Sequence, residues 1–389
     1  MSLRASLKTF ALLGSTLIPV VTAKAQLVKD SGCDCYMTNG SNVAFYTDHR
    51  FYDFRNLSQY QGVPELLTDP DDAADADPTS GYFTTEEWNS TWGIQSWNNS
   101  GSLTDGTAAV LMVNSPNNIY ISQNTDDSPT SHTYLVMRTA RHPDFQSAAE
   151  MESIGKGYQF LSVRMLARTI GSPGACTALF TYRGGDKPSQ VQEADIEVLT
   201  EGPRNMIQYT NQPSFTDGND SDDIPQATRN ATMPNGLDWS DWAVHRLDWT
   251  PKQSTWYVDG VEVASISFQT PRDPSQVILN AWSNGGGWSG NMTVHDEAFM
   301  QIQWLEMVFN STQEVADWTD TANITDSSGV ISRRSDKACK TVCSIDDTII
   351  RGVANKLWTG AAPGRLYDQS EVLVRWRSGL ALLAMLFMV

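Results

Sequence analysis

The chain has 389 residues and a formal net charge of -18 at pH 7, from 45 acidic and 27 basic residues. Nucleic-acid binding needs clustered Lys and Arg, so this balance argues against such a partner. The charge fits a protein that acts on neutral or cationic material. The 13 Trp and 12 Tyr supply a core and also flat aromatic surfaces on which sugar rings stack.

The N-terminus is typical of a signal peptide. Arg4 and Lys8 precede an apolar run over residues 10–21, and Ala23-Lys24-Ala25 then forms an A-x-A cleavage site. The run is too short to span a bilayer, which disfavours an anchor. We therefore expect residues 1–25 to be removed and the protein to be secreted, to the medium or the cell wall. Nine N-glycosylation sequons agree with this: they start at Asn39, Asn56, Asn89, Asn98, Asn219, Asn230, Asn291, Asn310 and Asn323.

Five cysteines would stand in an oxidising compartment. Cys33 and Cys35 lie near the start of the mature chain, and Cys339 and Cys343 lie beyond the central region. We expect these four to join the two ends, with three connectivities open. Cys176 is left over and is expected to be a buried small hydrophobe rather than a nucleophile.

The C-terminus ends in ten apolar residues, 380–389, after Arg375-Trp376-Arg377. A short terminal apolar tail in a secreted protein suggests a GPI signal. The alternatives are a simple hydrophobic tail and a single-pass anchor, for which ten residues are too few.

The sequence divides into a central domain and two extensions. Residues 26–80 form an N-terminal extension with the first cysteine pair and an acidic loop, expected to pack on the core. Residues 81–315 form the main domain. Residues 316–378 form a C-terminal extension with the second pair, in which 332–347 is expected to be a short helix, and residues 379–389 are the tail.

The main domain shows the pattern of an antiparallel β-sandwich or barrel. Short β-branched and aromatic runs are separated by Gly, Pro, Asn and Asp. Asp259-Gly260 between two such runs is a strong hairpin signal. The expected strands cover residues 108–113, 118–121, 133–138, 158–165, 176–182, 205–211, 242–249, 254–258, 277–282 and 300–309.

One stretch, residues 191–199, carries the strongest chemical signal. Glu193, Asp195 and Glu197 stand at i, i+2 and i+4, so in a strand they share one face. Like charges on one strand face repel one another, so this arrangement is unfavourable unless it serves a function. Cleavage of a glycosidic bond uses two carboxyl groups in one site. A solvated acidic face and an oxygen cluster for calcium are the alternatives.

A glycine-rich loop, residues 283–290, follows the run that ends at Trp282 and contains Trp288. Glycines let a backbone approach a ligand closely, and the tryptophans place an aromatic face beside it. We expect Trp282 to face a cleft, whereas Trp288 fits either a cleft or a core. His245, in another run, is more often a structural histidine than a catalyst.

These residues resemble glycoside hydrolase family 16. Glu193-Ala194-Asp195-Ile196-Glu197 looks like the family signature E-x-D-x-E. Three further segments stand in the expected order, and the match covers roughly residues 150–310. The segments are Gly171-Ser172-Pro173-Gly174 with the run 178–182, the hairpin His245 to Gly260, and the loop Asn280 through Trp288.

The resemblance implies an all-β, concanavalin A-like β-jelly-roll sandwich with a concave substrate cleft. It also implies a retaining mechanism with Glu193 as nucleophile, Glu197 as acid/base and Asp195 orienting the nucleophile. Four residues of extended strand span ~13 Å, whereas a retaining pair needs carboxyl groups ~5–5.5 Å apart. The strand must therefore bend. Glu197 is expected to be protonated at rest and Glu193 ionised.

The expected substrate contacts are mostly aromatic and polar. They are Tyr182, Tyr209, Asn211, His245, Trp282 and Trp288. No cofactor is expected. By analogy with the family, a structural calcium ion could bind on the convex face, but the sequence does not identify its ligands. Gln192 and Ala194 replace the usual acid and large aliphatic residue. Ala175-Cys176 stands where the laminarinase branches of the family have a tryptophan. This difference disfavours the substrate preference of pure laminarin-type enzymes.

The predicted function is a secreted, monomeric, retaining endo-β-glucanase that cleaves internal β-1,3 or mixed β-1,3-1,4 linkages of a polysaccharide. One alternative is a cell-wall transglycosylase acting on β-glucan or chitin, which resolves the same intermediate with a sugar hydroxyl. Another is a non-catalytic glucan-binding module.

Overall fold

The computed structural model describes residues 26–216, 223–312, 339–346, 348 and 350–360. The expected signal peptide, the apolar tail and the sequons at Asn219 and Asn323 lie outside these residues. Among the described residues, none of the helices has the length and apolar character needed to cross a membrane.

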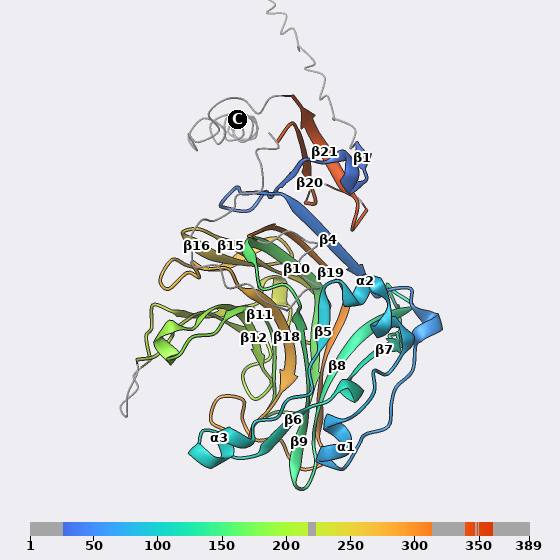
Figure 1. Cartoon of the computed structure of the whole chain (residues 1–389), viewed down its shortest axis with the longest axis vertical. Coiled ribbons are helices and arrows are strands. Elements are labelled where there is room, and N and C mark those ends of the chain that lie inside the picture. Colours follow the sequence, from blue (N-terminus) through green and yellow to red (C-terminus); the bar gives the residue numbers. More distant parts are fainter. Residues whose placement is uncertain (1–25, 217–222, 313–338, 347, 349, 361–389) are drawn as a thin grey trace, which may run out of the picture.

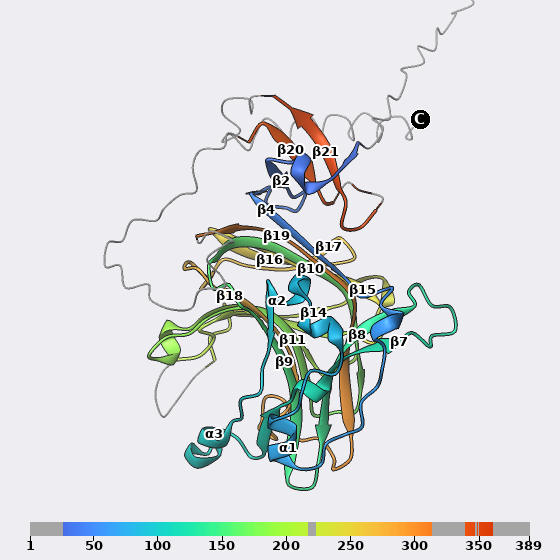
Figure 2. The same cartoon turned by 45° about the vertical axis from the view of Figure 1, so that its right-hand side comes forward.

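The large sheet folds into two layers, which we call the front sheet and the back sheet (Figures 1 and 2). The front sheet runs in the order β14 (Thr228–Thr232), β13 (Met206–Gln212), β12 (Gln192–Leu199), β11 (Cys176–Arg183), β18 (Gln276–Trp282) and β9 (Phe145–Ser153). The back sheet runs β8 (Thr133–Arg141), β19 (Glu297–Ser311), β10 (Tyr158–Gly171), β15 (Ala243–Thr250), β16 (Gln253–Val258) and β17 (Val261–Ile266).

Shorter elements surround this sandwich. Strands β4 (Asp48–Asp53) and β7 (Ile119–Gln123) pair with β19 and β8, and β5 (Trp92–Ile94) and β6 (Leu111–Asn114) pair with β9. The helices α1 (Pro70–Ala74), α2 (Glu86–Asn89) and α3 (Ser100–Asp105) each span six residues or fewer. Helix α1 lies within the expected acidic loop, where the Asp69 side chain caps it by accepting from the backbone of Asp71 and Asp72.

The hydrophobic core lies between the two sheets. In β12 the buried side chains of Ala194, Ile196 and Val198 belong to it, and in β15 those of Leu247 and Trp249 do. Because successive side chains of a strand point to opposite faces, every second side chain of these strands points into the core and the others point away from it. The fold is the all-β jelly-roll sandwich expected from the sequence.

The hairpin predicted at Asp259-Gly260 joins β16 to β17. Asp259 has φ 49° and Gly260 has φ 78°, so both turn residues adopt the left-handed region that a type I′ turn requires. The prediction of a short helix over 332–347 is wrong at 341–344. There, Thr341–Ser344 forms strand β20, because it pairs with two neighbouring strands and a disulfide fixes Cys343.

The two ends of the described chain build one small sheet. Its order is β1 (Leu27–Val28), β21 (Ala354–Thr359), β20, β2 (Cys35–Met37) and β3 (Phe45–Tyr46). Disulfides join Cys33 to Cys343 and Cys35 to Cys339. They confirm that the four cysteines connect the ends and select one of the three connectivities.

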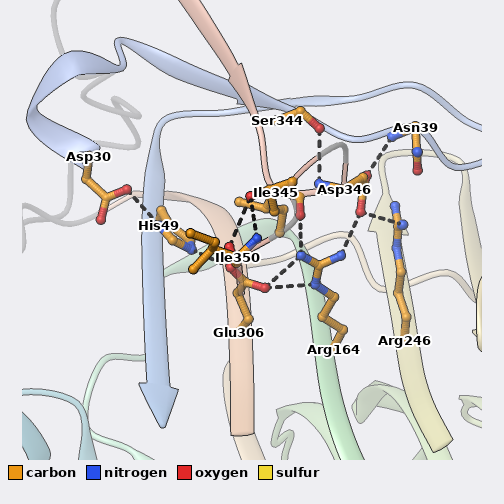
Figure 3. A network of polar contacts seen from close by, with 11 residues as sticks. Asp30, Asn39, His49, Arg164, Arg246, Glu306, Ser344, Ile345, Asp346 and Ile350 are labelled. Carbon is orange, nitrogen blue, oxygen red and sulfur yellow. Dashed lines mark hydrogen bonds and ion pairs between the residues drawn. The ribbon is translucent and has the colours of Figure 1, made fainter. Parts of the chain in front are cut away.

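The small sheet contacts the outer face of the back sheet through an ion network (Figure 3). Arg164 on β10 donates to Glu306 Oε2 at 2.7 Å and to Asp346 Oδ1 at 2.8 Å. Arg246 on β15 also donates to Asp346, at 3.1 Å. Asp346 follows β20, so this carboxylate ties the C-terminal segment to two strands of the back sheet.

The N-terminal segment joins the same network through His49 on β4. Its Nδ1 lies 2.8 Å from Asp30 Oδ1 and its Nε2 lies 3.0 Å from Glu306 Oε1. Burial alone would lower the pKa of His49, but the two carboxylates raise it to about 9. The histidine is therefore a cation between two acids at neutral pH. We call Asp30, His49, Arg164, Arg246, Glu306 and Asp346 the back network.

Candidate active site

Strand β12 places the three predicted acids on the outer face of the front sheet. Glu193, Asp195 and Glu197 alternate with the core residues Ala194 and Ile196. Asp195 is only 3% exposed, and the two glutamates are half-buried. Figure 2 shows the front-sheet strands curving as they cross the molecule. We call the outer surface of the front sheet the carboxylate face.

The register of neighbouring strands shows which other residues share this face, because directly opposed residues point the same way. Glu193 lies opposite Tyr182, Asp195 opposite Phe180, and Glu197 opposite Ala178. Residues opposed in the same way on β18, β9 and β13 also point to this face. They are Gln276, Ile278 and Asn280 on β18, Glu150 and Glu152 on β9, and Gln208, Thr210 and Gln212 on β13.

Trp288, in the glycine-rich loop, contacts Glu197, and Trp282, at the end of β18, lies opposite Cys176. The indole Nε1 of Trp288 donates to Glu197 Oε1 at 3.2 Å, and the side chain is 47% exposed. Trp282 pairs with Cys176 and is half-buried on the same face. The sequence was compatible with Trp288 in a cleft or in the core, and the structure places it beside Glu197. Gly285 in this loop has φ 70°, and a Cβ there would lie 2.6 Å from Val110 Cγ2.

Cys176 is buried, free of any disulfide and close to Glu197, with Sγ 3.8 Å from Glu197 Oε1. Burial and the nearby carboxyl group raise its pKa well above the usual value. A thiol held neutral is a weak hydrogen-bond donor and a poor nucleophile. Cys176 is therefore a buried small side chain, as expected, but one that also contacts the acid.

Three of the predicted substrate contacts face the core and not the carboxylate face, contrary to the prediction. Tyr209 is 1% exposed, and its ring centroid lies 5.4 Å from that of Trp256. Asn211 is fully buried and donates to the carbonyl oxygens of Ile266 and Phe268. Both stand opposite core residues of β12 in the register. Sugar in contact with the carboxylate face cannot reach them.

His245, the third of these residues, also faces the core. It lies opposite Met165 of β10, whose side chain belongs to the core, and is 5% exposed. Burial lowers its pKa to about 4. This neutral histidine lies in the back sheet, on the core side of β15, and is structural.

The three acids strongly influence one another's protonation. Burial and repulsion from Glu197 raise the pKa of Glu193 to about 8, although a hydrogen bond with Asp195 lowers it. Burial raises the pKa of Glu197 to about 7, although hydrogen bonds from Trp288 and Cys176 lower it. Burial and both glutamates raise the pKa of Asp195 well above its usual value. The two glutamates and Asp195 therefore hold protons to higher pH than isolated carboxyl groups do.

The sequence reasoning missed a second acidic pair on this face. Glu150 and Glu152 lie on β9, which was not among the expected strands. Trp97 Nε1 donates to Glu150 Oε1 at 2.7 Å, and Gln276 Nε2 donates to Glu152 Oε2 at 2.8 Å. The available signal was the spacing of two acids at i and i+2, which repeats that of β12.

No group of three or more His, Cys, Asp or Glu side chains within the described ranges is arranged to hold a metal ion. The paired carboxyl groups of the carboxylate face can carry out proton transfer and nucleophilic attack at a sugar carbon.

Known proteins resemble parts of this chain. A "Beta-glucanase" of Paenibacillus polymyxa is 24% identical over 157 residues, 40% of this chain and 60% of that protein. A "Beta-glucanase" of Bacillus subtilis is 26% identical over 153 residues, 38% and 57% of the two chains. The chain thus spans about three fifths of the length of these relatives.

A solved structure, the endo-beta-1,3-glucanase from Pyrococcus furiosus, aligns with 71% of this chain and 98% of its own, at 18% identity and a TM-score of 0.46. The model of "Glycosyl hydrolases family 16" matches residues 109–306, half of the chain, and includes the acids of β9 and β12. On this match, the chain belongs to glycosyl hydrolase family 16.

Proposed function

We propose that the protein is a retaining endo-β-glucanase that hydrolyses internal β-1,3 or mixed β-1,3-1,4 linkages. Two findings support this function: the family of the chain, whose model matches residues 109–306, and the names of the relatives to which the chain is similar. The carrying observation is the arrangement of Glu193, Asp195 and Glu197 on one face, with Trp288 bonded to Glu197.

The proposed reaction has two steps. The Glu193 carboxylate attacks the anomeric carbon and forms a glycosyl ester, while Glu197 gives its proton to the departing glycosidic oxygen. Glu197, now ionised, then takes a proton from a water molecule that attacks the same carbon and releases Glu193. One bond is hydrolysed, and the configuration is inverted twice and thus retained.

The surroundings of the two glutamates support these roles. Burial and repulsion disfavour two charges on the pair, so one proton is held there near neutral pH. Asp195 holds its own proton and hydrogen-bonds Glu193, which lowers the pKa of Glu193. Asp195 is therefore a positioning residue that favours the nucleophilic form of Glu193.

The test is Glu193→Gln, which removes the nucleophile and changes the shape little. We expect hydrolysis of lichenan and laminarin, measured as new reducing ends, to fall at least ~10³-fold, as for other losses of a covalent nucleophile. The melting temperature should not fall. Glu86→Gln, an exposed acid on α2, is the matched control and should retain activity. Hydrolysis by Glu193→Gln near the unaltered rate would refute the proposal.

The same assay separates hydrolysis from transfer. A labelled oligosaccharide acceptor is added to the glucan, and the label is followed into polymer. We expect new reducing ends and little labelled polymer. Labelled polymer in excess of new reducing ends would assign the transglycosylase alternative, and binding without either product would assign the non-catalytic module.

We also propose that the protein is secreted and glycosylated, and acts as a monomer. The two disulfides support an oxidising compartment. The asparagines of six sequons are exposed and open to a glycan: Asn39, Asn56, Asn89, Asn98, Asn230 and Asn291. GPI attachment is tested by release of the protein from cells with phospholipase C, and glycosylation by the mass lost on deglycosylation.

A further inference from the structure

The second acidic pair lies on the same surface as the proposed catalytic acids but away from them. Glu150 is opposite Asn280, Asn280 is opposite Ala178, and Ala178 is opposite Glu197. Three strand spacings separate β9 from β12, roughly 14 Å at the usual distance between neighbouring strands. A bound polysaccharide chain can span that distance, so both clusters can contact different sugar units of one substrate.

The pair has neutral hydrogen-bond donors but no cation. Glu150 accepts from Trp97 at 2.7 Å, and Glu152 accepts from Gln276 at 2.8 Å. Among the residues that the structure describes, neither acid forms an ion pair with Lys, Arg or His. Burial and repulsion from Glu152 raise the pKa of Glu150 to about 7. No cation of the described protein therefore compensates the charge of this pair, and Glu150 holds a proton up to about neutral pH.

An independent observation points to a ligand at this place. Asn280 is 91% buried, its Nδ2 faces Glu150 Oε2 at 3.5 Å, and its Oδ1 has no hydrogen-bond partner among the described residues. A buried acceptor without a donor is destabilising. An ammonium group has three N–H donors, no acceptor and a positive charge, and so matches a carbonyl oxygen beside two carboxyl groups.

Trp97 completes this place with a sugar-sized apolar surface. The side chain is 45% exposed, although its Nε1 is fixed on Glu150. An indole presented in this way can pack against a sugar ring and also attracts a nearby cation. We propose that Glu150, Glu152, Asn280 and Trp97 form a subsite for a cationic amino sugar, a 2-amino-2-deoxyglucose unit of a polysaccharide. The inference goes beyond the proposed function, because the neutral glucans named there contain no amino sugar.

The test compares three tetramers on the turnover-deficient Glu193→Gln protein: one of glucosamine, one of N-acetylglucosamine and one of β-glucan. Binding is measured by calorimetry at about pH 6, below the pKa of such an amino group. We expect the glucosamine tetramer to bind at least about tenfold more tightly than its N-acetylated form, as for a charge-assisted hydrogen bond. Added salt should weaken the binding of the glucosamine tetramer alone.

A second substitution locates the effect. Glu152→Gln, added to Glu193→Gln, should reduce the preference for the glucosamine tetramer about tenfold, whereas Glu86→Gln in the same background should leave the preference unchanged. Equal affinities for the glucosamine and N-acetylglucosamine tetramers would overturn the inference, and so would an unchanged preference in Glu152→Gln. The comparison of the three tetramers on the Glu193→Gln protein tests the inference even if the Glu152→Gln variant does not fold. The proposed function fails on a different readout, the hydrolysis of neutral glucans.

Discussion

Two groups of charged residues lie on opposite faces of the sandwich, and they are built differently. In the back network, Glu306 is bonded to Arg164 and His49, and its pKa is lowered despite burial. On the carboxylate face, Glu193 and Glu197 have no cation beside them among the described residues, and burial raises both pKa values. The first arrangement holds the small sheet on the back sheet. The second is costly to the fold, which is typical of a site used for chemistry.

The largest difference should appear when one acid of each group becomes an amide. Glu306→Gln leaves the buried Arg164 and the protonated His49 without their shared carboxylate, and should lower the free energy of unfolding by about 3 kcal/mol. Glu197→Gln removes an uncompensated acid and should not lower it. Urea unfolding at pH 7 measures both. Equal losses in the two variants would remove the distinction between the two faces.

A smaller effect concerns the pH dependence of stability. Because the folded pKa values of Glu193 and Glu197 are about 8 and about 7, the folded state binds more protons than the unfolded state above about pH 4.5. Stability should therefore fall as pH rises from there to about 8. The double variant Glu193→Gln/Glu197→Gln should show a shallower slope, with the part due to Asp195 remaining, and should be more stable than the unaltered protein at pH 8. Melting curves recorded across this pH range measure the slope. A steeper loss of stability with rising pH in the double variant than in the unaltered protein would contradict this expectation.

The smallest effect tests one hydrogen bond. Trp288→Phe removes the N–H that Glu197 accepts, and this bond lowers the pKa of Glu197. The alkaline limb of the kcat/KM profile, which reports the acid, should move to higher pH by less than about one unit. The exposed position of Trp288 leaves stability unchanged. A limb that moves to lower pH would show that the indole does not act on Glu197 as described.

Much of the fold could be predicted, because alternation and turn residues are local properties. The strands around β12 and the turn at Asp259-Gly260 followed from them. The errors at Tyr209 and Asn211 had a readable cause: Ile207 and Tyr209 alternate as apolar residues, which points position 209, and with it 211, to the core. His245 likewise stands two residues from Leu247, a core residue of the same strand.

Other features depend on contacts distant in sequence and could not be predicted. Strand β9 contains Ala148, Ala149 and Glu150, residues that do not favour strands, and it is fixed by pairing with β18 and β5. The disulfide connectivity follows from the pairing of β2 with β20, across some 300 residues of chain. The pKa of Glu197 depends on burial and on hydrogen bonds from Trp288 and Cys176, which approach from other segments.

The central claim is that Glu193 is the nucleophile, and azide rescue tests it most directly. Glu193→Ala opens a space beside the anomeric carbon, where azide can attack an activated aryl β-glucan oligosaccharide as the phenolate leaves. We expect restored turnover and an α-glycosyl azide, identified by NMR, because a single displacement inverts the β-configuration. A β-glycosyl azide from this variant, or rescue seen in Glu197→Ala with an α product, would contradict the assignment of Glu193.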